Sequence, residues 1–438
     1  MVTFFPDSAA IEHFWVEVVE KIKNKGSLDD QFKYTRFGKI KAKKTEQTGR
    51  SHCSPRDSKG QAGSFQVFQV CFRRKEKTTS TDRDCISLCI PPYMSIFAKI
   101  FPPAYPDLDW LQIGITTRCN ASCIYCPQSE FGKSLCSRDL SWETFKALIS
   151  AFLSTRLIYL QGWGEPMMHP GLMDMLKTVK ENGCMAGLTT NGMLLDPDRI
   201  KAFVDAGLDF LSLSLAGVDK KNDAIRKGTR LDRVLRVLDD IHRIRAASGA
   251  SHPRVHLAYM LLRSNLDDIP AMSRFFNSVD FDQVVISSLT LGFSSEMEKE
   301  MVLAENTSEF GNLKNRLREM RDKTSHPEKI HFHLYNPGKR PGPCSENILR
   351  SAYIDVEGTL KPCVCTDFSG LKAASIRPNQ STGPYPHHRY DFGHVLTHGV
   401  NHLWHSKPYR AFRRSWELEK IPEGCRYCTK PYIDDLRC

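Results

Sequence analysis

The chain has 438 residues, of which 41% are hydrophobic and 25% are charged, and its formal net charge is +11. This composition is typical of globular proteins and excludes a collagen-like, coiled-coil or wholly disordered chain. The length exceeds what one hydrophobic core usually supports, so two or three domains are expected. No apolar run is long enough to cross a bilayer, and the first residues lack the order of a signal peptide. The sequence therefore predicts a cytoplasmic protein with no membrane partner.

Much of the positive charge lies near the N-terminus. Between Arg36 and Asp84 the sequence has 13 Lys or Arg against 5 Asp or Glu, in a stretch rich in Ser, Thr, Gly and Gln. Residues 1–93 are therefore predicted to be a basic, partly disordered extension, with a basic arm for an acidic partner as the alternative. Because this segment is separate from the cysteines and shows no stacking surface, no nucleic-acid partner is expected, and a zinc-stabilised nucleic-acid-binding protein is only a remote alternative.

From residue 110 onward, short apolar runs alternate with amphipathic stretches, a pattern that predicts a parallel sheet with crossover helices. The strands are expected at residues 110–116, 156–160, 185–189, 210–215, 255–260 and 283–287. Helices are expected at residues 141–153, 172–182, 197–206 and 231–246. We expect an α/β fold in which residues 94–330 form a partial (β/α)6 TIM-type barrel. The three-cysteine loop, the GWGEP segment, Asn191 and Ser214 lie at or just after the ends of predicted strands. Barrel active sites lie at the carboxyl ends of the strands, so these segments should converge on one site.

A Pro- and Gly-rich linker then leads to a smaller cysteine-rich domain at residues 331–438. Its sequence predicts a short hairpin with a glycine turn around Gly358 and a final helix at residues 400–419.

Fifteen cysteines, an odd number, are more easily explained in a reducing compartment as metal ligands or reactive thiols than as disulfides. Cys119, Cys123 and Cys126 place three thiols on one loop after the first strand. Thiolates are preferred ligands of iron-sulfur clusters and of zinc. A structural zinc site uses four ligands, whereas three leave one metal position open for chemistry.

The segment ITTRCNASCIYCP resembles the signature loop of the radical S-adenosylmethionine (radical SAM) enzymes. The resemblance covers about 180 residues and implies a catalytic [4Fe-4S] cluster on Cys119, Cys123 and Cys126, whose open iron binds S-adenosylmethionine. It also implies a set of cofactor-binding residues: Tyr125, Gly162, Gly164, Glu165, Asn191, Ser214 and Arg226. The GWGEP segment is similar to the glycine-rich GGEP segment of the family, although Trp163 replaces the commoner second glycine.

The cysteines near the C-terminus form a second group, in which Cys344 and Cys363 flank Gly358 and a CxxC pair follows at Cys425 and Cys428. Paired cysteines alone would also suit structural zinc. After a radical SAM barrel, however, the pattern resembles the auxiliary iron-sulfur domains called SPASM and twitch, which implies one auxiliary [4Fe-4S] cluster on these four residues. Cys365 and Cys438 are the alternatives, as substitute ligands or as members of an incomplete second site.

The resemblance implies an oxidoreductase or maturase that cleaves S-adenosylmethionine to a 5'-deoxyadenosyl radical and abstracts hydrogen from a peptide, a protein side chain or a small metabolite. Its partners would be that substrate and a low-potential electron donor such as flavodoxin or ferredoxin. A dehydrogenase of a small alcohol or sugar is the alternative within the same family. No catalytic residue beyond the cluster ligands is identified from the sequence.

Overall fold

The computed structural model describes residues 43–44, 66–72, 84–90, 108–131, 137–292, 294–342, 344–367, 390–426 and 428–436. The chain divides into two units, one of which is residues 5–101. The described part of that unit is a three-stranded antiparallel sheet of β1 (Lys43–Lys44), β2 (Gln66–Phe72) and β3 (Asp84–Ile90). Short strands are therefore present within the predicted N-terminal extension, whose boundary at residue 93 stays a prediction.

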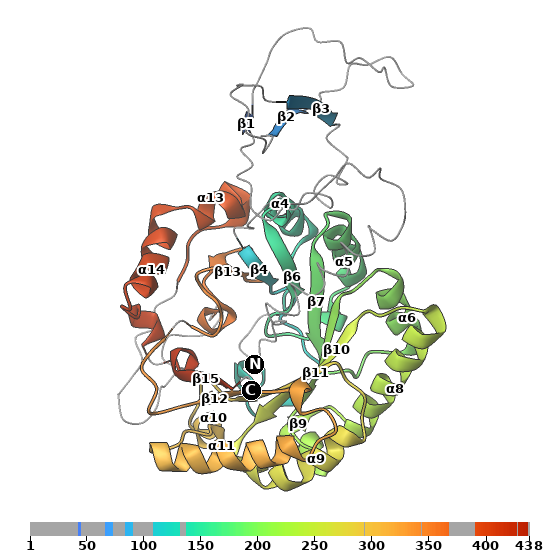
Figure 1. Ribbon diagram of the computed structural model, residues 1–438, viewed down its shortest axis with the longest axis vertical. Coiled ribbons are helices and arrows are strands. Elements are labelled where there is room, and N and C mark those ends of the chain that lie inside the picture. The colour runs from blue at the N-terminus through green and yellow to red at the C-terminus, as the bar shows by residue number, and fades with distance from the viewer. Residues whose placement is uncertain are drawn as a thin grey trace, which may run out of the picture. The chain divides into compact units, whose positions relative to one another are not determined.

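The larger unit is organised around one sheet, whose order is β14-β13-β4-β6-β7-β8-β10-β11-β12-β15. Its six consecutive central strands are parallel and correspond to the six predicted ones. They are β4 (Leu108–Ile113), β6 (Thr155–Leu160), β7 (Met185–Thr190), β8 (Phe210–Leu215), β10 (Arg254–Leu261) and β11 (Gln283–Ser288). The predicted α/β architecture is confirmed, and the helices that connect these strands lie along the outside of the sheet (Figure 1).

The C-terminal part of the chain extends this sheet at both edges. After β11, β12 (Ile330–Tyr335) joins in parallel and β15 (Ile433–Leu436) follows it in antiparallel orientation. Beside β4, β13 (Ser351–Ile354) adds in parallel and forms the predicted hairpin with β14 (Leu360–Lys361). The domain boundary predicted at residue 330 thus falls at the first residue of β12 and stays a prediction.

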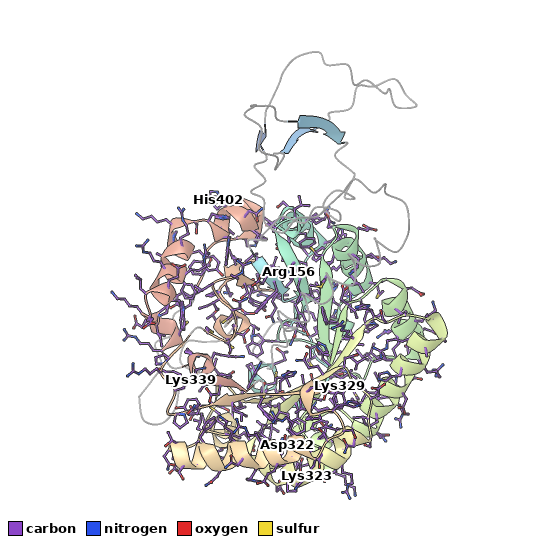
Figure 2. The ribbon with its side chains drawn as sticks, in the orientation of Figure 1. Arg156, Asp322, Lys323, Lys329, Lys339 and His402 are labelled. Atoms are coloured by element: carbon purple, nitrogen blue, oxygen red, sulfur yellow. The ribbon has the colours of Figure 1, made fainter. Side chains whose placement is uncertain are left out.

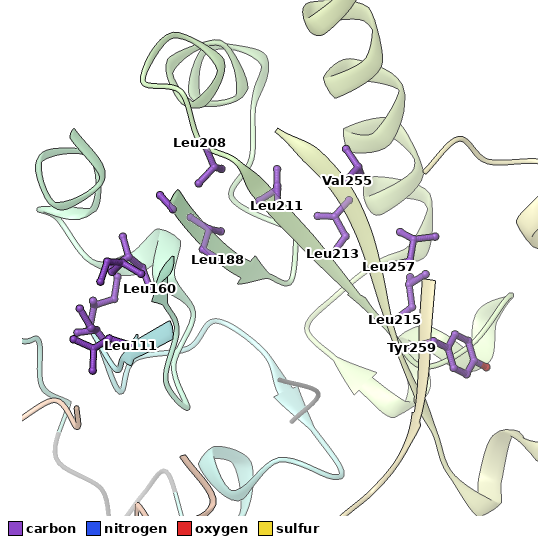
Figure 3. Close-up of a cluster of buried hydrophobic side chains, with 14 of the residues drawn as sticks. Leu111, Leu160, Leu188, Leu208, Leu211, Leu213, Leu215, Val255, Leu257 and Tyr259 are labelled. Carbon is purple, nitrogen blue, oxygen red and sulfur yellow. The ribbon is translucent and has the colours of Figure 1, made fainter. Parts of the chain in front are cut away.

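The core lies between the sheet and its helices. The main covering helices are α4 (Trp142–Phe152), α5 (Leu172–Glu181), α6 (Pro197–Asp205), α8 (Leu231–Ser248), α9 (Ile269–Asn277) and α11 (Thr307–Asp322). Neighbouring strands bring leucines into register: Leu188 pairs with Leu211, and Leu213 pairs with Leu257 (Figure 3). All four are fully buried. Ser141 caps the first of these helices, α4, since its hydroxyl accepts a hydrogen bond from the Thr144 amide.

The predicted final helix at residues 400–419 is instead two helices, α13 (Val400–Trp404) and α14 (Lys407–Glu417). Ser406 interrupts them because its backbone is extended and its hydroxyl accepts from the Tyr409 amide as the cap of α14. Polar side chains such as Asp322, Lys323 and His402 lie on the surface (Figure 2). Within the described residues, no helix is both long and apolar enough to cross a membrane.

Candidate functional site

The cysteine loop is held in place by a small sheet separate from the main one. Strand β5 (Ser122–Cys123) pairs with β9 (Arg226–Lys227), so that Cys123 lies opposite Arg226. The Ile124 amide also donates to the Ile225 carbonyl at 3.0 Å. The segment that precedes Arg226 is the helix α7 (Lys220–Ile225). Backbone hydrogen bonds therefore bring Arg226, about a hundred residues away in sequence, against the cysteines.

One pocket gathers nearly all of the predicted site residues. Its lining includes Cys119, Cys123, Tyr125, Cys126, Gly164, Glu165, Asn191, Ser214 and Arg226. Gln161, Thr189, Thr190, Ala121, Ala258 and Met260 complete it. Ser214 is within β8, Gly164 and Glu165 lie in the loop after β6, and Asn191 follows β7. The predicted convergence at the carboxyl ends of the strands is thus what the structure shows. Among the residues predicted to bind the first cluster and its cofactor, Gly162 alone is outside this lining.

Arg226 is buried in the pocket with part of its guanidinium group unpaired. Its side chain is 4% exposed, Nη1 donates to the Tyr125 hydroxyl, and Nε has no partner among the described residues. The Glu165 carboxylate of the same pocket interacts electrostatically with Arg226. A guanidinium with a free N–H also suits a further carboxylate or hydroxyl acceptor. The pocket therefore has a donor ready for an oxygen-bearing ligand.

Glu165 joins the loops that follow β6 and β7. Its carboxylate accepts from the Thr190 hydroxyl at 2.7 Å, from the Asn191 amide at 2.8 Å and from the Met167 amide at 3.2 Å. Asn191 in turn donates through Nδ2 to Asn120 Oδ1 at 2.7 Å, which reaches the cysteine loop. Burial raises the pKa of Glu165, against these hydrogen bonds. These contacts position the loops, while a direct contact of Glu165 with a cofactor stays a prediction.

The glycines of GWGEP are required by close backbone packing. A Cβ on Gly164 would lie 2.4 Å from the Thr116 carbonyl oxygen and 2.7 Å from that of Arg118. A Cβ on Gly162 would lie 2.7 Å from the Gly114 Cα. Both glycines therefore let the loop after β6 pack closely against the segment between β4 and the cysteines.

The thiols of the loop are strongly desolvated. Burial raises the pKa of Cys119 to about 12 and that of Cys126 to about 11. A metal centre that binds their thiolates must therefore displace protons. No group of His, Cys, Asp or Glu within the described residues converges on a single-ion site. In a cubane cluster each thiolate binds a different iron, so three cysteines would leave the fourth iron open for another ligand. Arg226, beside the cysteines, could donate hydrogen bonds to oxygen atoms of that ligand.

The second cysteine group also comes together. Cys344, Cys425 and Cys428 are partly buried, and each lies near enough to another cysteine of the group to have the pKa of its thiol raised further by it. Cys363 begins the 3-10 turn η4 (Val364–Thr366) and its thiol hydrogen bonds with that of Cys365. Cys365 is 7% exposed, whereas Cys438 lies outside the described residues.

A buried ion pair, which the sequence analysis missed, lies within this group. Lys430 Nζ is 2.5 Å from Glu346 Oε1, and the side chains are 10% and 3% exposed. Burial acts to lower the pKa of Lys430, but the Glu346 carboxylate and nearby cysteines raise it above the ordinary value. Lys430 therefore stays charged beside Cys428. The signal available in the sequence was its position, two residues after the CxxC pair.

Two family descriptions match the chain at these two cysteine groups. The Radical SAM superfamily matches residues 113–276, and the iron-sulfur cluster-binding domain called SPASM matches residues 344–429. The chain thus contains a radical SAM domain followed by a SPASM domain. The predicted family is thereby confirmed, as is its C-terminal iron-sulfur domain.

Relatives of this radical SAM protein include the tungsten-containing aldehyde ferredoxin oxidoreductase cofactor-modifying protein of Pyrococcus furiosus. The two are 23% identical over 310 residues, which cover 70% of this chain and 83% of the relative. The GTP 3',8-cyclase of Chlorobaculum tepidum is 33% identical over 169 residues, but these cover 37% of this chain and 48% of that protein. The match thus spans about half of the cyclase. Streptococcus suis SuiB bound to S-adenosylmethionine shares the fold, with a TM-score of 0.52, 13% identity and coverage of 71% of this chain and 68% of that one.

Trp163 connects the radical SAM domain to the SPASM domain. Its indole Nε1 donates to the Asp367 carbonyl at 3.1 Å, and its side chain packs against the cluster of Tyr353, Val364 and Cys365. The residue that departs from the common glycine-rich motif therefore contacts the SPASM domain. Its partner Asp367 is 204 residues away in sequence, so no local signal could have revealed the contact.

Proposed function

We propose that this protein binds a [4Fe-4S] cluster through Cys119, Cys123 and Cys126 and, with S-adenosylmethionine, abstracts a hydrogen atom from its substrate. The observation that carries the proposal is the shared pocket, in which three thiols face a buried arginine with an unpaired Nε. When bound, the cluster and S-adenosylmethionine supply a 5'-deoxyadenosyl radical, with methionine as the second product.

The residues of the pocket have separate tasks in this proposal. Arg226 donates through Nε to a carboxylate or ribose oxygen of the cofactor, and Tyr125 fixes the guanidinium by accepting from Nη1. Ser214 offers a hydroxyl for the same ligand. Glu165 and Asn191 hold the loops in register through the contacts described above. Ala258 and Met260 form an apolar wall that excludes water from a reactive radical.

The SPASM domain is proposed to hold one auxiliary [4Fe-4S] cluster on Cys344, Cys363, Cys425 and Cys428. The positive charge of Lys430 near Cys428 and Cys365 offsets part of the negative charge of such a cluster. The cluster would accept an electron from the substrate, or bind the substrate if one iron is open. A low-potential donor such as flavodoxin or ferredoxin would supply the catalytic cluster.

The proposed substrate is a peptide, a protein side chain or a small metabolite. The Pyrococcus furiosus relative is named as a cofactor-modifying protein, which favours a maturase, although its 23% identity leaves the substrate to be tested. A dehydrogenase of a small alcohol or sugar is the alternative, since it would use the same pocket.

Anaerobic purification tests the proposal, with iron, acid-labile sulfide and zinc counted per chain in the wild type and in Cys119→Ala/Cys123→Ala/Cys126→Ala. About eight irons should fall to about four in the triple variant, because a cubane holds four. Reduction of the wild type with S-adenosylmethionine should release 5'-deoxyadenosine, and the triple variant should release none. Zinc in place of iron at either group would overturn the mechanism. About twelve irons would mean that Cys365 and Cys438 serve a second auxiliary cluster.

A further inference from the structure

Gln161 has a buried side-chain amide with no partner on either end. It follows β6 directly, is 0% exposed and lines the pocket that holds the three cysteines. Neither Oε1 nor Nε2 has a hydrogen-bond partner in the described part of the chain. A buried amide left unpaired costs free energy at both its donor and its acceptor. Such a group, facing a cavity, indicates a ligand that completes both bonds.

The backbone around Gln161 is fixed, so the side chain cannot easily turn elsewhere. Its carbonyl accepts from Gln112 Nε2 at 3.0 Å, and its amide N donates to the Tyr159 carbonyl at 3.0 Å. Two residues earlier, the Tyr159 hydroxyl is 3.0 Å from both Thr189 Oγ1 and Ser212 Oγ, so these hydroxyls are paired with one another. The Gln161 side-chain amide has no such partner among the described residues.

The chemistry of the amide limits what can bind it. Nε2 offers two donors and Oε1 accepts, so a neutral group with an acceptor beside a donor completes both. A carboxylate would satisfy Nε2 but leave Oε1 facing a negative oxygen, and an ammonium would do the reverse. A primary carboxamide, the N–H and C=O of one residue in an extended peptide, or the edge of an adenine presents this pair on one side. The N–H and C=O of a single trans peptide bond point in opposite directions and do not.

The position of Gln161 favours the substrate over the cofactor as the source of this pair. Arg226 and Tyr125 lie with the cysteine loop, on β9 and next to β5. Gln161 contacts β4 through Gln112 and precedes Trp163, whose ring packs against the SPASM cysteine Cys365. The residue next to Gln161 also approaches the SPASM domain, because a Cβ on Gly162 would lie 3.2 Å from the Tyr353 hydroxyl oxygen. Gln161 is therefore beside residues that contact the SPASM domain.

We infer that Gln161 binds an amide group of the substrate through paired hydrogen bonds and so selects amide-bearing substrates such as peptides. The inference rests on the proposed function, because it assigns a substrate class to the same pocket. Gln161 is a specificity residue in this assignment and takes no part in binding the cluster.

The experiment uses reconstituted, full-length wild type and Gln161→Met, which keeps the length of the side chain and removes both hydrogen-bonding groups. The probe is acetamide, a primary amide that presents a donor and an acceptor on one edge, and the matched probe is acetone, which has an acceptor but no donor. Both are used with ordinary methyl groups to measure binding and with deuterated methyl groups to measure turnover. Probe binding is followed by saturation-transfer NMR with S-adenosylmethionine present. Turnover is followed by the mass of the 5'-deoxyadenosine, which gains one deuterium when the probe donates its atom to the adenosyl radical.

The wild type is expected to bind and use acetamide in preference to acetone, and Gln161→Met should lose this preference by about tenfold, since one unpaired amide costs a factor of this size. Affinity for S-adenosylmethionine, measured by calorimetry, should change by less than about twofold. Gln161→Glu keeps the shape and the acceptor but adds charge, and it should lose the amide preference too. Iron content in each variant shows that the protein is folded.

Other outcomes overturn the inference in distinguishable ways. Equal binding of both probes by the wild type, or equal binding of acetamide by the wild type and Gln161→Met, would show that Gln161 recognises no substrate amide. A tenfold loss of S-adenosylmethionine affinity with amide binding intact would assign the side chain to the adenine instead. Absence of 5'-deoxyadenosine in the wild type would reject the proposed function, while the NMR measurement would still decide whether the pocket recognises an amide.

Discussion

The three cysteines of the catalytic loop lie within eight residues, whereas the four predicted SPASM ligands span 85 residues. The first group is held by backbone, because β5 pairs with β9 and the neighbouring loops hydrogen bond to one another. The second depends on side chains from distant segments, with buried ion pairs such as Lys430–Glu346 and Lys361–Asp355. Cysteines that are close in sequence can thus be positioned mainly by the backbone of one loop. Cysteines from distant segments depend in addition on buried ion pairs that hold those segments together.

The largest expected effect on stability comes from breaking the Lys430–Glu346 ion pair of the second region. Lys430→Met leaves the Glu346 carboxylate buried and unpaired, which should lower the free energy of unfolding by about 3–5 kcal/mol. Denaturant unfolding measures it. The loss should be accompanied by depletion of about four irons, with those of the catalytic loop retained.

The matched control for this prediction is the double variant Lys430→Met/Glu346→Leu, which removes both charges. It should recover much of the lost stability, because two apolar side chains need no counter-charge. If the single and double variants are equally unstable, the pair is not what fixes the SPASM cysteines, and the contrast between the two regions fails.

In the region of the three-cysteine loop, the corresponding test is to add a methyl group where two backbone segments pack closely. Gly164→Ala would place a methyl group against the Thr116 and Arg118 carbonyls, 2.4 and 2.7 Å away. We expect a loss of about 1–3 kcal/mol in thermal or denaturant unfolding, together with weaker binding of S-adenosylmethionine. Gly311→Ala is the control, since nothing lies within 4 Å of its added Cβ in α11. That variant should gain about 0.5–1 kcal/mol, and a gain at Gly164 as well would refute the requirement for a glycine.

The sequence predicted the fold and the site of the three-cysteine loop more fully than it predicted the site of the SPASM cysteines. Period-two and helical patterns placed the six central strands, and three cysteines on one loop needed no knowledge of distant packing. Pairing of β12 with β11 and of β13 with β4 was not predicted, because strand partners far apart in sequence leave no local signal. For the same reason Gln161 and Lys430 escaped notice, since burial and lack of a partner are properties of the folded chain.

The two regions should also differ in their response to acid. His256 is on β10, two residues before Ala258 of the catalytic pocket, and burial lowers its pKa to about 3. The unfolded chain therefore takes up a proton near pH 6.5 that the folded chain refuses, and stability falls as the pH drops from about 6.5 toward 3.

At pH 5 this difference amounts to about 2 kcal/mol, at about 1.4 kcal/mol for each pH unit. His256→Leu removes the titrating group, so its stability should decline less between pH 7 and pH 5 than that of the wild type. Parallel denaturant titrations at the two pH values measure the difference, and equal slopes in both proteins would contradict it.

The smallest expected effect on stability concerns Trp163, whose side chain contacts the SPASM domain. Trp163→Phe keeps an aromatic ring against Cys365 and removes only the indole donor to the Asp367 carbonyl. A loss of about 0.5–1.5 kcal/mol is expected, the net value of one hydrogen bond. Trp163→Ala removes the ring as well and should also shift the electron paramagnetic resonance signal of the reduced auxiliary cluster, because the protein contacts beside Cys365 change. A shift in the signal of the catalytic cluster alone would place the main effect of Trp163 in the GWGEP loop and leave the two cysteine sites independent.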